Sequence, residues 1–139
     1  MPTIKVEFTT DVKAKAERLW DILTDVKSWP EWQGTSYIKP IPTSPLKDGS
    51  TFKVELAGLK WDITVTKAER PNKLSWIGRR VGLKGIHDWE FIEEGGKTKA
   101  ITRESMSGWM LLFLYPIAKT QVPKAEKWLI DLKARAETV

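Results

Sequence analysis

The sequence predicts an α+β fold that combines an antiparallel sheet of six to seven strands with a long C-terminal helix, in the order β-α-α-β-β-β-β-β-β-α. Three observations predict this class. Apolar and polar residues alternate with a period of two near the N-terminus and again across residues 35–107. Turn residues divide this middle region into short strands, which pair antiparallel because parallel pairing needs long crossovers. Residues 118–136 instead repeat apolar positions at helical spacing.

The N-terminal segment predicts a strand and then a helix. Ile4, Val6 and Phe8 alternate with charged or polar residues, as in a half-buried strand. From Ala16 the apolar spacing becomes that of a helix, which we expect to end near Thr24.

Residues 25–34, DVKSWPEWQG, predict a second short helix that forms a bent pair with the first. Ser28 and Glu31 have the spacing of a capping box. Pro30 suits the first turn of a helix, where its missing N–H costs nothing.

Turn residues also predict which residues face each other across the middle strands. A two-residue loop at 95–96 gives the pairs Phe91–Ala100, Trp89–Thr102, His87–Glu104 and Asp88–Arg103. A two-residue loop at 82–83 gives the pairs Leu74–Phe91, Trp76–Trp89 and Gly78–His87. One face then carries Leu74, Trp76, Trp89 and Phe91, with space beside Gly78.

His87 and Glu104 are expected side by side on this otherwise apolar face. They could anchor a ligand hydroxyl or carbonyl, or form an acid/base pair. The alternative is a satisfied buried hydrogen bond in which Glu104 holds His87 in one tautomer. We favour this hydrogen bond or simple ligand anchoring over catalysis.

The C-terminal region predicts an amphipathic helix. Its buried stripe is expected to contain Ala118, Val122, Ala125, Leu129, Leu132 and Ala136. Pro116 and Pro123 should each kink this helix or start a new one. On the solvent side, Asp131 with Arg135 and Lys133 with Glu137 are candidate ion pairs at i, i+4 spacing.

Composition excludes several classes of site. The chain has no cysteine and one histidine, which rules out thiol nucleophiles, disulfides and sites that need two histidines. We therefore expect no metal and no cofactor. The net charge of +5 is spread among acidic residues along the chain, so no nucleic-acid partner is expected. No leader or membrane-spanning run is seen, which predicts a cytoplasmic protein, and residues 1–139 read as a single domain.

Six segments in order, LWDILTDVKSWPEWQG, Gly49-Ser50, LSWIG, GIHDWEF, EEGGKTKAITRESMSGW and LIDLKARAE, resemble the SRPBCC superfamily. This is the START, polyketide cyclase/dehydrase and lipid-transport group, with the helix-grip fold of the major birch-pollen allergen. The resemblance covers essentially the whole chain and implies a curved antiparallel sheet of six to seven strands around the long C-terminal helix, with a cavity between them. It also implies that Trp20 and Trp29 are core residues and that Trp32 lies near the cavity wall. The alternative is that Trp29 and Trp32 form only a hydrophobic plug.

The first functional hypothesis is the binding, or transport, of a hydrophobic small molecule or lipid in that cavity. Apolar burial would give affinity, and one or two polar anchors would give orientation. Arg80 could meet an acidic head group or point to solvent. The candidate ligand-binding residues are Trp32, Phe52, Val54, Trp76, Gly78, Arg80, His87, Trp89, Phe91, Glu104, Met106, Phe113, Val122 and Leu129. We expect Met106, Phe113, Val122 and Leu129 on the helix side of the cavity.

Two alternatives stay open. A cyclase or dehydratase would use His87 as general acid or base with Glu104, although no G-x-S-x-G motif is present, so we weigh against an enzyme. A membrane or macromolecule interaction module would use residues 109–118, WMLLFLYPIA, with Lys119 and Lys124 nearby. This run is too short to span a bilayer, and buried core or a cavity lid is the preferred interpretation. Exposed, it could contact a membrane transiently or mediate a weak dimer of an otherwise monomeric protein.

Overall fold

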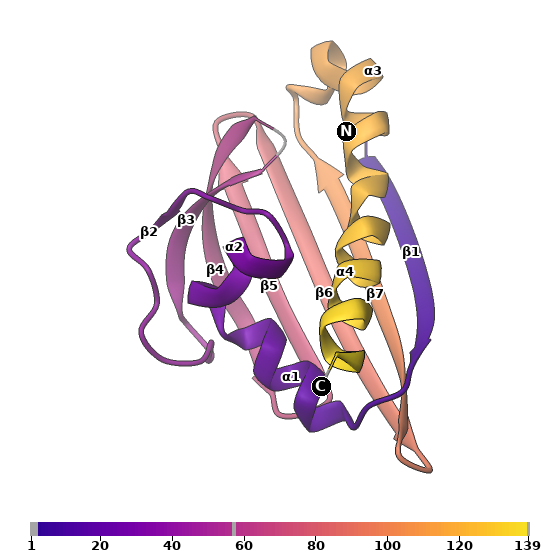
Figure 1. The fold of residues 1–139 in the computed structure, drawn as a ribbon. Coiled ribbons are helices and arrows are strands. Elements are labelled where there is room, and N and C mark those ends of the chain that lie inside the picture. The colour runs from indigo at the N-terminus through magenta and orange to yellow at the C-terminus, as the bar shows by residue number, and fades with distance from the viewer. Residues whose placement is uncertain (1–2, 57, 139) are drawn as a thin grey trace.

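The structure, a computed structural model, describes residues 3–56 and 58–138, which form one seven-stranded antiparallel sheet with helices on one face (Figure 1). The sheet order is β1-β7-β6-β5-β4-β3-β2, so the first and last strands are neighbours. The strands are β1 (Thr3–Val12), β2 (Ile38–Lys39), β3 (Thr51–Leu56), β4 (Leu59–Glu69), β5 (Lys73–Arg80), β6 (Leu83–Glu94) and β7 (Lys97–Ser107). The predicted fold class is confirmed.

The two short helices follow β1 as expected. Helix α1 (Ala16–Thr24) leads through a 3-10 turn, η1 (Val26–Ser28), into α2 (Trp29–Trp32). Pro30 lies in the first turn of α2, but the expected capping box is wrong, because the Ser28 hydroxyl donates to the Asp25 carbonyl at 2.8 Å. Ser28 already has helical backbone angles, whereas a capping residue is typically extended.

The C-terminal region is two helices rather than one. Helix α3 (Leu111–Gln121) runs through Pro116, and a 3-10 turn, η2 (Val122–Lys124), contains Pro123 and precedes α4 (Ala125–Glu137). All six residues of the predicted apolar stripe are buried. In Figure 1, α4 lies along the sheet face and α3 projects at one end of the sheet.

One of the two predicted surface ion pairs is present. Lys133 contacts Glu137 at 2.9 Å. The pairing of Asp131 with Arg135 is wrong, because Asp131 accepts from Lys127 at 2.7 Å and Arg135 lies 3.7 Å from Glu31. Such exposed pairs add little to stability.

One predicted register is confirmed and one is wrong. The β6–β7 hairpin has all four expected pairs, including His87 opposite Glu104. In the β5–β6 hairpin the loop is 81–82, because Arg80 pairs with Leu83. This register has the pairs Leu74–Trp89, Trp76–His87 and Gly78–Gly85. The difference is two residues, so each side chain stays on the predicted face.

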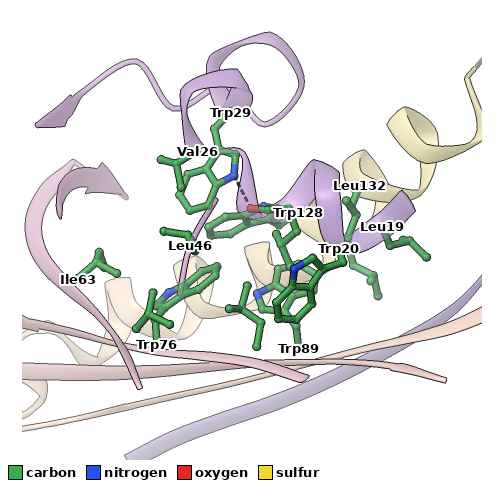
Figure 2. Close-up of a cluster of buried hydrophobic side chains, with 14 of the residues drawn as sticks. Leu19, Trp20, Val26, Trp29, Leu46, Ile63, Trp76, Trp89, Trp128 and Leu132 are labelled. Atoms are coloured by element: carbon green, nitrogen blue, oxygen red, sulfur yellow. Dashed lines mark hydrogen bonds between the residues drawn. The ribbon is translucent and has the colours of Figure 1, made fainter. Parts of the chain in front are cut away.

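An aromatic cluster fills the core between α2, α4 and the sheet (Figure 2). Trp29 is only 1% exposed, and its ring centroid lies 5.2–5.7 Å from those of Phe52, Trp76 and Trp128. Its indole N–H donates to the Leu23 carbonyl at 3.0 Å. Trp29 therefore covers other core residues and locks α2 against the end of α1.

None of the helices in residues 3–56 and 58–138 is long and apolar enough to cross a membrane.

Candidate functional site: a cavity between the sheet and the C-terminal helix

A cavity of about 310 Å³ lies between the sheet face and the chain from Gln121 to Asp131. Trp61, Trp76 and Trp128 supply aromatic walls, and the exposed Lys124 and Lys127 bring it to the protein surface. This volume is at the lower end of the range of small-molecule pockets, which are mostly apolar with a few polar groups.

Two facing residues of the cavity wall have no side chain. Gly78 of β5 and Gly85 of β6 are direct cross-strand partners, and both line the cavity. A Cβ at Gly85 would meet only the Ser105 carbonyl oxygen, at 3.7 Å, whereas one at Gly78 would lie 3.1 Å from Ile63 Cδ1. Larger residues at these positions would extend into the cavity. The sequence predicted the space beside Gly78 but missed Gly85.

His87 is held on the cavity wall by aromatic rings. It is 3% exposed, its ring stacks on Trp89 at 4.8 Å, and Nε2 lies 2.6 Å from the Thr102 hydroxyl. Burial lowers the pKa of His87 to about 3, so the imidazole is neutral near pH 7. It could accept a proton or a hydrogen bond, but it is not protonated in advance to act as an acid.

Glu104 faces His87 across the sheet, yet the expected bond between their side chains is not formed. Among the described residues, no hydrogen bond or ion pair joins the Glu104 carboxyl to any group, and His87 bonds to Thr102 instead. Burial raises the pKa of Glu104 to about 7. A carboxyl with this pKa is partly protonated at neutral pH, and its protonated form can donate a hydrogen bond into the cavity.

Three buried tryptophans among the described residues have an indole N–H group without a hydrogen-bond acceptor. Within the described part of the chain, Nε1 of Trp32, Trp89 and Trp128 is buried and has no partner. Trp128 lines the cavity, and buried donors without partners are rare in folded proteins. An oxygen atom of a bound molecule could satisfy such a donor.

Six of the fourteen candidate ligand-binding residues lie on the cavity wall. These are Trp76, Gly78, His87, Glu104, Met106 and Val122. Met106 was expected on the helix side but belongs to β7.

The other eight candidates lie elsewhere in the fold. Five are buried in the packed core, namely Phe52, Val54, Trp89, Phe91 and Leu129. Trp32 is half-buried against that core rather than on the cavity wall, and Arg80 is half-buried at the end of β5. Phe113 is 73% exposed, so its expected place inside the cavity is wrong. It lies on α3, which projects at one end of the sheet (Figure 1).

Sequence reasoning missed several residues of the wall, of which Trp128 is the largest. Its signal was present, because it follows Ala125 by three positions and precedes Leu132 by four, which places it on the buried helix face. Trp61 and Ile63 of β4 also line the cavity and were not among the candidate residues. The polar side chains of Gln33 and Gln121 gave no pattern that could have identified them.

Comparison with known proteins identifies the family of the chain. The family described as "Polyketide cyclase / dehydrase and lipid transport" matches residues 3–137, and the chain belongs to that family. No curated protein sequence matches the chain.

Solved structures show the same fold at low sequence identity. A hypothetical protein of Helicobacter pylori superposes with a TM-score of 0.79 at 20% identity, covering 98% of this chain and 88% of its own. A START superfamily protein of Mycobacterium smegmatis has a TM-score of 0.74 at 17% identity, with 96% and 97% covered. The Zhui aromatase/cyclase of a Streptomyces species has a TM-score of 0.76 at 14% identity, with 98% and 94% covered. These likenesses establish the superfamily fold, which hosts more than one function.

Proposed function

We propose that the protein binds a hydrophobic small molecule or lipid in the cavity between the sheet and α4. The observation that carries this proposal is an aromatic-walled cavity above the Gly78–Gly85 pair, with the unpartnered Glu104 carboxyl on its wall. Contact with the indole walls would provide affinity, and the few polar groups would orient the ligand.

The polar groups of the wall favour a ligand with an accepting oxygen. Protonated Glu104 and the Trp128 N–H would both donate, and neither has an acceptor among the described residues. A ketone, ester or hydroxyl oxygen on an otherwise apolar molecule would match these donors. Leaving them unpaired beside a purely hydrocarbon ligand would cost about 1–3 kcal/mol each.

A cavity-filling variant tests the proposal. Gly85→Leu should place its side chain in the cavity, whereas Ser105→Leu adds a side chain of the same size on the other face of the sheet. The probe is the naphthyl ketone 6-propionyl-2-(dimethylamino)naphthalene, followed by energy transfer from tryptophan. We expect Gly85→Leu to weaken binding at least about tenfold and Ser105→Leu to bind normally. Equal affinity in the two folded variants would refute binding in this cavity.

A second candidate function is proton transfer in a cyclase or dehydratase reaction. It is favoured by the Glu104 pKa of about 7, which suits a general acid at neutral pH. The likeness to an aromatase/cyclase supports only the fold. With a short poly-β-ketone thioester as substrate, Glu104→Gln should keep binding and lose about 100-fold or more in rate. Without measurable turnover by the wild-type protein, this second candidate fails and the binding proposal stands.

A further inference from the structure

Helix α3 exposes large apolar side chains that a soluble helix normally buries. Leu112, Phe113 and Ile117 are 69%, 73% and 60% exposed. With the neighbouring β5–β6 turn they form what we call the apolar patch, made of Val81, Trp109, Leu112, Phe113, Tyr115 and Ile117. The expectation that 109–118 is core or a cavity lid is therefore wrong for most of its side chains. Contiguous exposed apolar surface of this kind marks an interaction site.

The apolar patch is held in place by close backbone packing. The Met110 N–H donates to the Gly82 carbonyl at 3.1 Å, and a Cβ on Gly108 would collide with that same carbonyl. Leu111 and Ala118 are buried and attach the inner side of α3. The exposed side chains are therefore presented by a docked helix.

The two segments of the sequence that carry the apolar patch contain basic residues and no acidic ones. Residues 105–125 and 70–87 contain no aspartate or glutamate. Within the described residues, no ion pair or hydrogen bond is formed by the side chains of Arg79, Arg80, Lys84, Lys119 and Lys124. Asp62 is the strand partner of Arg79, but its carboxylate pairs with Lys53 at 3.5 Å. Nε of Arg80 is buried without an acceptor.

We propose that the apolar patch docks on the surface of an anionic phospholipid bilayer, with the five basic residues contacting lipid phosphates. An eleven-residue helix cannot span a bilayer but can lie in its interface. Trp109 and Tyr115 are the aromatic types that favour the interface. Two other partners fit this surface less well. A second copy of the chain would bring basic residues of the same charge together, and a nucleic acid would leave the apolar side chains exposed to water.

Docking would place the ligand cavity at the bilayer. Gln121 ends α3 and lines the cavity, and η2 follows it directly. The proposal goes beyond ligand binding and does not require the cavity to be occupied.

Vesicle flotation with a matched pair of variants tests the apolar contact. The vesicles contain phosphatidylcholine and phosphatidylglycerol in equal amounts. Leu112→Asp/Phe113→Asp adds two charges to the patch, and Ile92→Asp/Ile130→Asp adds the same two charges at exposed isoleucines elsewhere. We expect the first variant to bind at least about tenfold more weakly than the second. The thermal unfolding temperature of each variant is the control, because similar values exclude loss of fold as the cause of weaker binding.

A second pair of variants tests the phosphate contact. Arg79→Gln/Lys84→Gln should weaken binding roughly fivefold per residue. Lys97→Gln/Lys99→Gln has the same net charge, at the β6–β7 hairpin end opposite α3 (Figure 1), and should bind as the wild type does. Binding should fall with salt and be lost on pure phosphatidylcholine.

Three results would overturn the proposal. They are a wild-type protein that does not float with anionic vesicles, equal binding by the two aspartate variants, and a dimer in size-exclusion chromatography that the patch variant abolishes without any vesicle binding. The last result would assign the surface to a second copy of the chain.

Discussion

Replacing Glu104 with glutamine should stabilise the protein at alkaline pH and have little effect at acid pH. Glutamine has nearly the same shape and resembles the protonated carboxyl. Burial raises the pKa of Glu104 from 4.5 to about 7, so the folded state holds a proton that the unfolded state releases between these values. Wild-type stability from this group is therefore present below pH 4.5 and lost as pH rises through 7.

The size of the effect follows from that pKa difference. One pKa unit corresponds to about 1.4 kcal/mol, so ionised Glu104 costs at most about 3 kcal/mol of unfolding free energy above pH 7. Partial exposure of Glu104 reduces this value through solvent screening. We expect the variant to exceed the wild type by about 1–3 kcal/mol near pH 8.

Urea unfolding followed by tryptophan fluorescence measures this difference at a series of pH values. His87 acts in the opposite direction, because its lowered pKa removes stability as pH falls from 6.5 toward 3. Both proteins contain His87, so its contribution cancels in their difference. Glu94→Gln, at an exposed carboxylate, serves as the control. A Glu104→Gln difference that does not change with pH would refute the assignment of Glu104 to a buried site.

Three further predictions concern stability and use the same unfolding assay. Trp20→Ala should cost about 3–5 kcal/mol because a buried indole is lost, and a cost below about 1 kcal/mol would contradict its core position. Thr102→Val should cost about 1–3 kcal/mol because His87 loses its hydrogen-bond partner. Recovery in Thr102→Ser is the control, and no recovery would assign the loss to packing. Gly108→Ala should be destabilising by about 1–3 kcal/mol, since Gly108 has φ of +135° and its Cβ would meet the Gly82 carbonyl. A neutral Gly108→Ala would show that this junction is free to move.

Short-range chemistry made most of the fold predictable. Side-chain alternation marked the strands, helical spacing marked α1 and α4, and the Gly95-Gly96 loop set the β6–β7 register. The β5–β6 register could not be predicted in the same way, because the single Gly82 is compatible with a two-residue loop at 81–82 or at 82–83. There, Gly82 also packs against Met110 from a distant part of the chain.

Part of the candidate site was predictable for a related reason. Strand pairing placed His87 opposite Glu104, since backbone register follows from the turn. Side-chain partners were not predictable, because His87 turned toward Thr102 and left Glu104 unpaired. Both Gly78 and Gly85 line the cavity. These two glycines are cross-strand neighbours only in the observed register and not in the predicted one.

The sequence by itself determined the order of the strands and the face on which each strand residue lies, because these depend on local periodicity and turn chemistry. Only the tertiary structure decided which aromatic residues fill the core and which line the cavity. It also decided that the apolar run 109–118 lies largely on the surface. The sequence alone does not distinguish an apolar side chain that the fold buries from one that stays exposed.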